Sequence, residues 1–484
     1  MNNHKKTISV TASFLALLPL SCAVHAFAQT PSQGAPLPDA PQSRLIELAS
    51  SQAPSAPMPA ASAQSSADAS GESSSPQHAL TRSEAEQMAI KNNPQVSISH
   101  LLALAQHQVV RETRSAELPT AVVSATAMDA ALATRISSGS LTASRLFSHA
   151  GVGANVTQLI TDFGRTSNLV AFSKLQEKAQ NATALATAED IIIATDQAFY
   201  NALQAQALLE VAKQNVATRT TTDKQVSEMT KNKLKSILDL SFADVNLSQA
   251  KLMLLDAQNN ADSSMAALDA VLGFDHQAIY QLVDDASSMQ PPPADADQLV
   301  QLGLQQRPDL QALDFSQQAA IKYSRAQRDQ LFPTISAAGT VGSVPVRPDQ
   351  YYSSNWWGGV GVNMDIPVFN GFLYTAQAKE AKIRAQATKE QSRDLRDRIV
   401  RDIRTSWLAA NTAYQRVTVS AELLREANLA LKLAATRYQM GLSSIVELSQ
   451  AQFQQTDAAI ANTNAQYQYR LALATLNYQI GTNP

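Results

Sequence analysis

Hydrophobic and polar positions along this chain follow a helical pattern over most of its length. The stretches 165–272, 372–440 and 442–480 contain neither glycine nor proline, which predicts helix. The stretch 165–231 alone would form a helix roughly 100 Å long at about 1.5 Å per residue. In the second stretch apolar and small residues recur in steps of three and four, the heptad pattern of a coiled coil. These residues are Val417, Ser420, Leu424, Ala427, Leu431, Ala434 and Tyr438.

A second pattern, with a period of two, precedes each long helical stretch. Val360, Val362 and Met364 alternate with Gly361 and Asn363, which predicts a strand with one apolar face. The segments 151–156 and 359–364 correspond to each other at a distance of 208 residues. Each half of the chain thus predicts two strands around a loop, with the loops near 128–149 and 343–355.

The two halves of the chain repeat one another. The segment Ser236–Ser241 returns as Ser444–Ser449, again 208 residues later. The prolines before the strands, Pro119 and Pro333, are 214 residues apart instead. The first copy therefore has six extra residues, which we assign to the first strand loop.

The N-terminus predicts export and a linker. Lys5 and Lys6 precede a short apolar stretch, and Ala26-Phe27-Ala28 is a typical cleavage site, so residues 1–28 are interpreted as a signal peptide. Acylation at Cys22 is the alternative. Residues 29–77 are rich in proline, alanine and serine and are predicted to be a disordered linker.

We expect the remaining chain to divide into a first repeat, a connector and a second repeat. The first repeat spans residues 78–273 and the second spans residues 298–484. The connector, residues 274–297, contains three consecutive prolines and should be irregular, with one short helix at most.

Charge and composition exclude several classes of function. The 38 Lys and Arg residues nearly balance the 41 Asp and Glu residues, which argues against nucleic-acid binding. The single cysteine excludes an intrachain disulfide framework and a cysteine-rich metal site. No histidine has metal-ligand spacing or a neighbouring nucleophile, so we expect no cofactor, no metal and no enzymatic activity.

Aromatic residues cluster in and just after the second predicted strand loop. They are Tyr351, Tyr352, Trp356 and Trp357. Aromatic residues at strand ends suit a membrane interface. A hairpin of a soluble sheet with aromatic residues near its turn is the alternative on these strands alone.

Taken together, these features resemble the TolC-like outer-membrane efflux proteins. The resemblance covers about residues 80–484 and depends on the duplicated order of helix, hairpin, long helix, turn and helix. Individual matching elements include Asn93-Pro94, Arg307-Pro308, Phe369-Asn370-Gly371 and Tyr438–Leu448.

The resemblance implies a mixed fold. A long α-helical coiled-coil barrel would project into the periplasm, and a membrane β-barrel would be completed by trimerisation. Each protomer of the homotrimer would contribute four strands. The implied partners are outer-membrane lipid, a periplasmic adaptor protein and an inner-membrane transporter.

The resemblance also implies a gate near the start of the last helix. The two acidic positions that line the constriction in this family correspond to Glu447 and Gln450, so only the first keeps its charge. Tyr438 and Asp239 correspond to a pair that links the two turns. An ordinary solvated charge on a helix face is the alternative for Glu447.

The resemblance places adaptor docking at the two helix-to-helix turns. In the second copy the docking residues are Gly441, Leu442 and Ser443. In the first copy they are Lys233, Leu234 and Ser236, where lysine replaces the glycine. Because glycine commonly ends helices, an ordinary turn is the alternative.

Two functions therefore remain open from the sequence. The first is an outer-membrane channel of a tripartite efflux or type I secretion system. The second is an exported coiled-coil scaffold without a pore.

Overall fold

The computed structural model describes residues 78–128, 135–136, 144–145, 149–274, 280–284, 289–343 and 356–482. The predicted signal peptide, with Cys22, and the predicted linker lie outside these residues. Tyr351, Tyr352 and most of both strand loops lie outside them too.

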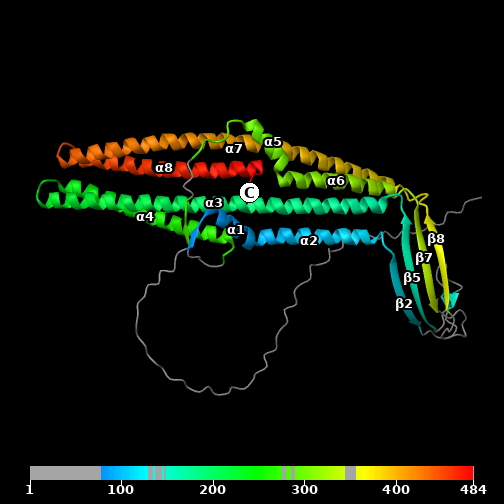
Figure 1. Cartoon of the computed structure of the whole chain (residues 1–484). Helices are drawn as coiled ribbons and strands as arrows, with labels where there is room; N and C mark the ends of the chain where they lie inside the picture. The colour runs from blue at the N-terminus through cyan, green and yellow to red at the C-terminus, as the bar shows by residue number, and fades with distance from the viewer. Residues whose placement is uncertain are drawn as a thin grey trace, which may run out of the picture. The chain divides into compact units, whose positions relative to one another are not determined.

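The helices form two sets of equal lengths (Figure 1). They are α1 (Arg82–Asn92), α2 (Pro94–Ser115), α3 (Arg165–Lys231), α4 (Ile237–Leu272), α5 (Ala296–Gln306), α6 (Pro308–Asp329), α7 (Leu373–Gln439) and α8 (Ile445–Ile480). The matched helices have 11, 22, 67 and 36 residues in both copies. The starts of α1 and α5 differ by 214 positions and those of α3 and α7 by 208, so the six extra residues lie between α2 and α3, as predicted.

Local side chains determine where the helices begin. Thr81 accepts a hydrogen bond from the backbone N–H of Glu84, whose carboxylate accepts one from the N–H of Thr81, so α1 starts with a capping box. Asn93 ends α1 in an extended conformation, and its side chain accepts from the N–H of Gln95. Pro94 then occupies the first position of α2, where its missing N–H costs nothing.

A sheet of four antiparallel strands connects the helices of each half. It consists of β2 (Thr120–Met128), β5 (His149–Thr161), β7 (Thr334–Ser343) and β8 (Trp357–Asp365), in the spatial order β2-β5-β7-β8. A separate short pair, β3 (Arg135–Ile136) and β4 (Ser144–Arg145), lies in the first strand loop. The predicted strands are therefore confirmed, and β2 and β8 are the two edges of the sheet.

The sheet has one apolar face. Val360 is 93 % exposed and Val362 is 70 % exposed. Their partners on β7 are Gly339 and Ala337. The same face continues across β5 through Val156, the partner of Gly339. An apolar face left this exposed needs a nonpolar environment or another protein surface.

The long helices lie side by side in a layer (Figure 1). Next to the sheet the order is α2-α3-α6-α7, and beyond α1 and α5 it is α4-α3-α8-α7. The predicted heptad positions of α7, from Val417 to Tyr438, are all buried or half-buried, which confirms the coiled-coil seam. One edge of the layer is formed by α2 and α4, and the other by α7.

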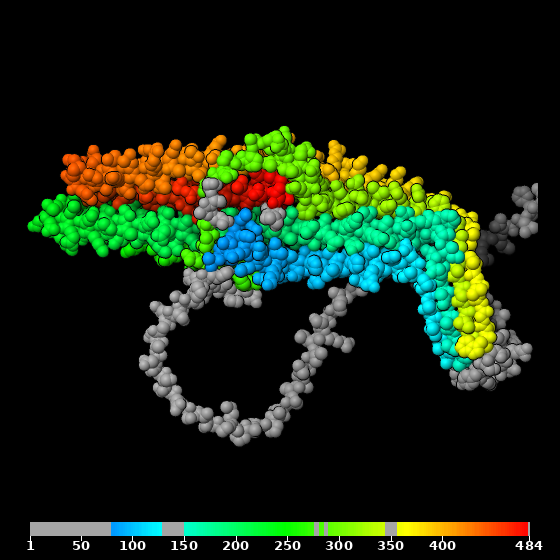
Figure 2. Space-filling view, in the orientation of Figure 1, coloured from blue at the N-terminus to red at the C-terminus, as the bar shows by residue number. Residues whose placement is uncertain are grey.

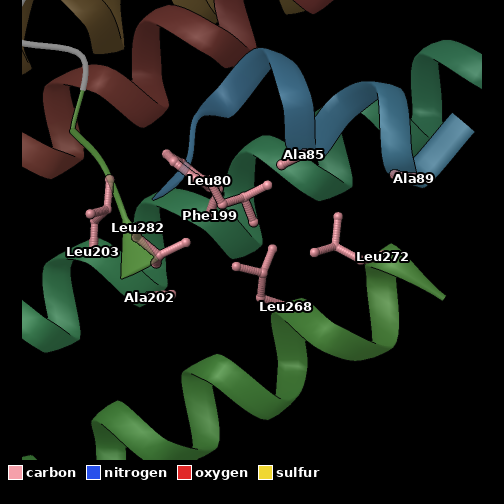
Figure 3. Packing of buried hydrophobic residues seen from close by; sticks show 9 residues of the cluster. All are labelled: Leu80, Ala85, Ala89, Phe199, Ala202, Leu203, Leu268, Leu272 and Leu282. Carbon is pink, nitrogen blue, oxygen red and sulfur yellow. The ribbon is translucent and has the colours of Figure 1, made fainter. Parts of the chain in front are cut away.

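A hydrophobic core fixes α1 against the long helices. Leu80, Phe199, Leu268 and Leu272 are almost fully buried there (Figure 3). Leu282 joins them from β6 (Tyr280–Leu282), which pairs in parallel with β1 (His78–Leu80).

The described part of the connector corrects one expectation. It contains the strand β6 and no helix before α5 begins at Ala296. A three-residue strand is too short to show a period in the sequence. Its partner β1 lies about two hundred positions earlier, so only the folded chain brings the two together.

Candidate functional site

The two helix-to-helix turns have the same backbone geometry. The turn after α3 has Lys233 at φ 61°, and the turn after α7 has Gly441 at φ 73°. In each turn the next amide reaches back five residues: the N–H of Leu234 donates to the carbonyl of Met229 at 2.8 Å, and that of Leu442 to the carbonyl of Arg437 at 2.9 Å. Both turns are therefore Schellman motifs, and the lysine adopts a left-handed conformation that usually favours glycine.

Four helices meet in a small core beneath these turns. Val226 of α3, Ala243 of α4, Tyr438 of α7 and Ile445 and Leu448 of α8 are all buried. The turns are therefore held together by contacts within one chain. Above this core the leucines of the turns point outward, Leu234 with 73 % and Leu442 with 64 % of its surface exposed.

Of the other predicted docking residues, Ser236 has a structural role at this tip and Ser443 makes no side-chain hydrogen bond among the described residues. The hydroxyl of Ser236 accepts a hydrogen bond from the N–H of Asp239 and caps α4. Ser443 is half-buried, and its hydroxyl has no hydrogen-bond partner among the described residues.

Glu447 has an ionic partner that the sequence did not indicate. Its carboxylate lies 3.1 Å from Nε of Arg437, and both side chains are about half exposed. Gln450 is exposed one turn later on α8. The ion pair joins the end of α7 to the start of α8. Its two residues do not share a helix, so no helical spacing in the sequence could indicate the pair.

Tyr438 is near enough to Asp239 to be affected by its charge, but no hydrogen bond joins the two among the described residues. Tyr438 is 2 % exposed, and its hydroxyl has no hydrogen-bond partner among the described residues. Burial and then the charge of Asp239 raise the pKa of Tyr438. Asp239 instead accepts hydrogen bonds from the backbone N–H and the hydroxyl of Ser236. Lys235 makes the contact between the turns, since its Nζ lies 4.5 Å from the centre of the Tyr438 ring.

A buried polar contact joins the two copies further along the layer. Arg219 of α3 donates to Oε1 of Gln452 at 2.7 Å, and Gln452 donates to the hydroxyl of Thr222 at 2.9 Å. Arg219 is 7 % exposed, and burial lowers its pKa. This contact links α3 to α8, and sequence analysis missed it because the residues are 233 positions apart.

The aromatic residues at the far end of the sheet lie on different faces. Trp356, 68 % exposed, has the parity of Val360 and so belongs to the apolar side. Trp357 has the parity of Asn363 and lies 3.7 Å from the position of a Cβ on Gly342, so it belongs to the polar side. The interface role predicted from the sequence fits the position of Trp356 better than that of Trp357.

A second aromatic group, which sequence analysis missed, marks the end of the sheet next to the helices. Phe163 lies near Phe332 with ring centres 6.0 Å apart, and Phe369 lies near Phe372 at 5.6 Å. All four are largely exposed. The pair of Phe163 and Phe332 depends on the meeting of the two copies, whereas Phe369 and Phe372 are three residues apart in one copy.

Among the described residues, no group of three or more His, Cys, Asp and Glu side chains is placed to hold a metal ion. None of the helices described above is long and apolar enough to cross a bilayer.

Comparison with known proteins assigns the fold and the family. The sequence profile described as "Outer membrane efflux protein" matches residues 86–274 and 299–482, most of the chain. The chain belongs to this family.

Individual relatives agree with this family assignment. Outer membrane protein TolC of Escherichia coli (strain K12) is 24 % identical over 349 residues, which cover 67 % of this chain and 69 % of TolC. The structure of CusC is similar with a TM-score of 0.73 at 17 % identity, covering 83 % of this chain and 92 % of CusC. The CmeC channel of Campylobacter jejuni is similar with a TM-score of 0.73 at 19 % identity, covering 83 % and 85 %. These structures confirm the predicted TolC-like mixed fold.

Family membership decides between the two functions that the sequence left open. The protein is an outer-membrane efflux channel, with its sheet at the outer membrane and its helices in the periplasm. The predicted function and localisation are confirmed, and the scaffold without a pore is set aside.

Proposed function

We propose that three copies of this chain close into one gated duct that carries substrates to the exterior. The observation that supports this proposal is the sheet of four strands with two free edges, β2 and β8, and an exposed apolar face. Four strands are too few to close a barrel, and open sheet edges do not persist in lipid. A homotrimer would supply twelve strands and pair every edge.

The two edges of the helical layer differ in a way that suits head-to-tail contact. Apolar side chains are exposed on both, and such rows usually mark contact surfaces. On the α2 and α4 edge they include Leu101, Leu102, Leu104, Leu238, Leu252 and Leu255. On the α7 edge they include Ile383, Leu408, Leu423 and Leu433. Because the edges are different, each copy would contact the next through unlike surfaces, which is the arrangement that forms a ring.

The gate would lie at the tip of the helices. Three symmetry-related Glu447 side chains would form an acidic ring that attracts cations and narrows the pore, with Gln450 one turn further along. Arg437, 3.1 Å from Glu447 in the same protomer, would offset part of that negative charge. Tyr438 and Asp239, together with Lys235, would hold the two turns of one protomer together in the closed state.

The partners would be a periplasmic adaptor protein and an inner-membrane transporter. A passive duct has no energy source, so efflux needs a pump elsewhere. The exposed leucines of the tip, Leu234 and Leu442, suit docking of an adaptor, and the turns at Lys233 and Gly441 present them. Ser236 and Ser443 lie beside these leucines, where an adaptor would also contact them.

Single-channel recording of the purified protein in planar bilayers tests the gate. Replacing Glu447 with Gln should lower the preference for cations over anions by about twofold or more, because three negative charges leave the constriction. Replacing Arg437 with Gln should raise this preference, because the remaining carboxylates lose their neutralising partner.

A matched control removes the same charge far from the tip. Glu422 is exposed on α7, and Glu422→Gln should leave the selectivity unchanged. If Glu447→Gln also leaves conductance and selectivity at the wild-type values, the acidic ring is ruled out.

A further inference from the structure

A groove between α6 and α7, close to the sheet, is lined by basic residues. Its volume is about 520 Å³. Five of its lining residues are cationic and none is acidic: Arg325, Arg328, Lys379, Lys382 and Lys389. The groove also has an apolar component, because Ala378 and Ala385 are half-buried within it and Ile321 lies beside them. Such a lining suits a ligand that combines an anionic group with carbon chains.

Most of these cations have no carboxylate partner in the part of the chain that the structure describes. Arg328 pairs with Asp329 at 2.9 Å. For Arg325, Lys379, Lys382 and Lys389, no ion pair occurs among the described residues. Neighbouring arginines of α7 are different, because Arg384, Arg393 and Arg398 each pair with an acid of their own helix. Along α7 from Leu373 to Arg398, the cations without an ion pair among the described residues therefore all line the groove.

The groove opens on the face of the layer that carries the connector and α5. Lys379 and Gln386 precede Val400 and Trp407 by three heptads each, so they share a face of α7. On that face the indole N–H of Trp407 donates to the carbonyl of Pro293 in the connector at 2.7 Å. Figure 2 shows α5 lying against α7 on this side. In a closed ring of helices, added elements have most room outside, so we infer that the groove faces outward.

The position along the helices brings the groove next to the membrane. Arg325 and Arg328 lie in the last turns of α6, which ends at Asp329, five residues before β7. Lys379 and Lys382 lie within the first ten residues of α7, about 14 Å from its start at about 1.5 Å per residue. The exposed pair of Phe369 and Phe372 lies between them and the strand β8. Aromatic residues of this kind mark the level of lipid head groups.

We propose that this groove binds the phosphate-bearing head group of an anionic lipid from the periplasmic leaflet. The cations would contact the phosphate, and the apolar lining would contact the glycerol and the first acyl carbons. Such a lipid would fix the depth of the channel in the membrane from outside the duct. The proposal depends on the outward direction of the groove and on the sheet as the membrane-spanning part.

Native mass spectrometry of the full-length protein, purified in detergent and titrated with lipid, tests this proposal. The probes are dioleoylphosphatidylglycerol, which is anionic, and dioleoylphosphatidylcholine, which has no net charge. The wild-type protein should bind phosphatidylglycerol about tenfold more tightly or better, because each nearby cation adds to the attraction. The variant R325Q/K379Q/K382Q should lose this preference.

The control variant R384Q/R393Q/R398Q removes the same number of positive charges from α7 outside the groove, and it should keep the preference. If the groove variant does not assemble, the wild-type protein still provides a test. Its preference should weaken between low salt and 0.5 M salt, where the screening length falls to a few ångströms.

Three results of the lipid titrations would overturn the proposal. They are equal binding of both lipids by the wild-type protein, a preference insensitive to salt, and a preference equal in the groove variant and the control. Displacement of phosphatidylglycerol by millimolar inorganic phosphate would also overturn it, because the groove would then be a site for small anions. The groove variant should retain wild-type conductance, so failure here is distinguishable from failure of the proposed gate.

Discussion

At the scale of single residues, a pair of acids is buried between α1 and α3. Asp196 is 1 % exposed and Glu86 is 8 % exposed. Arg82 lies 3.5 Å from Asp196 and 3.4 Å from Glu86. Burial and then a hydrogen bond with Glu86 raise the pKa of Asp196 to about 7, against the lowering effect of Arg82. The folded protein therefore holds a proton that the unfolded chain would release at lower pH.

This pair predicts how stability depends on pH. Because the folded-state pKa of Asp196 is raised, stability should fall as pH rises from about 4 to about 7, by at most about 1.4 kcal/mol per pH unit, and then level off. Asp196→Asn mimics the protonated form, so its gain in melting temperature over wild type should be largest at pH 8 and absent at pH 4. Circular dichroism melts of the purified protein at both pH values measure this.

The exposed Asp256 of α4 offers a control. Asp256→Asn should keep the pH profile of the wild-type protein. If the melting temperatures of Asp196→Asn and of the wild-type protein differ by the same amount at every pH, the folded protein does not hold the extra proton at Asp196.

At the scale of elements, the two turns at the tip adopt one conformation with different residues. Lys233 and Gly441 both have positive φ, which costs an ordinary residue roughly 1–2 kcal/mol and glycine very little. A Cβ on Gly441 would meet no atom within 4 Å. Any effect of a side chain there would therefore arise from the backbone and not from a clash.

Substitutions at these two positions should change the stability of their turns in opposite directions. Gly441→Ala should destabilise the second turn by about 1 kcal/mol, and Lys233→Gly should stabilise the first turn by less than that, since glycine also gains freedom in the unfolded chain. Hydrogen exchange of the Leu442 and Leu234 amides reports each turn separately.

Asparagine tolerates the left-handed region better than alanine does. The Leu442 amide should therefore exchange more slowly in the Gly441→Asn variant than in the Gly441→Ala variant. Identical exchange rates of the Leu442 amide in the wild-type protein, Gly441→Ala and Gly441→Asn would show that the left-handed conformation does not affect the stability of this turn.

At the scale of the whole molecule, the two faces of the sheet belong to different environments. Val360 and Val362 lie on the apolar face and Asn363 on the polar face, one residue apart along β8. In a closed barrel the apolar face would contact lipid and the polar face would line the duct. The chain thus offers positions on one strand that lie on opposite faces of the sheet.

Lysine substitutions at Val360 and Asn363 should show which face of the sheet contacts lipid. Val360→Lys should lose most of the oligomer in the outer-membrane fraction, because a lysine facing lipid near the middle of the bilayer costs roughly 2–4 kcal/mol. Asn363→Lys should assemble normally, since water would solvate its charge. Semi-native gel electrophoresis of membrane fractions measures the assembled protein, and equal yields of the two variants would contradict the assignment of the faces.

The elements of this fold were predictable because their determinants are local. The absence of glycine and proline from residue 165 to residue 231 predicts α3. The alternation around Val360 predicts β8. Each of these patterns lies within the element that it predicts, and the duplicated half of the chain repeats it.

The sequence by itself therefore determined the long helices, the strands of the four-stranded sheet, their duplication and the family resemblance. Only the tertiary structure decided which side chains meet. Arg437 forms an ion pair with Glu447 across a turn, Lys235 lies over the Tyr438 ring, and β1 pairs with β6 in the connector. The basic groove likewise needs α6 and α7 side by side. These contacts depend on distance and orientation after folding, and no periodic pattern along the chain encodes them.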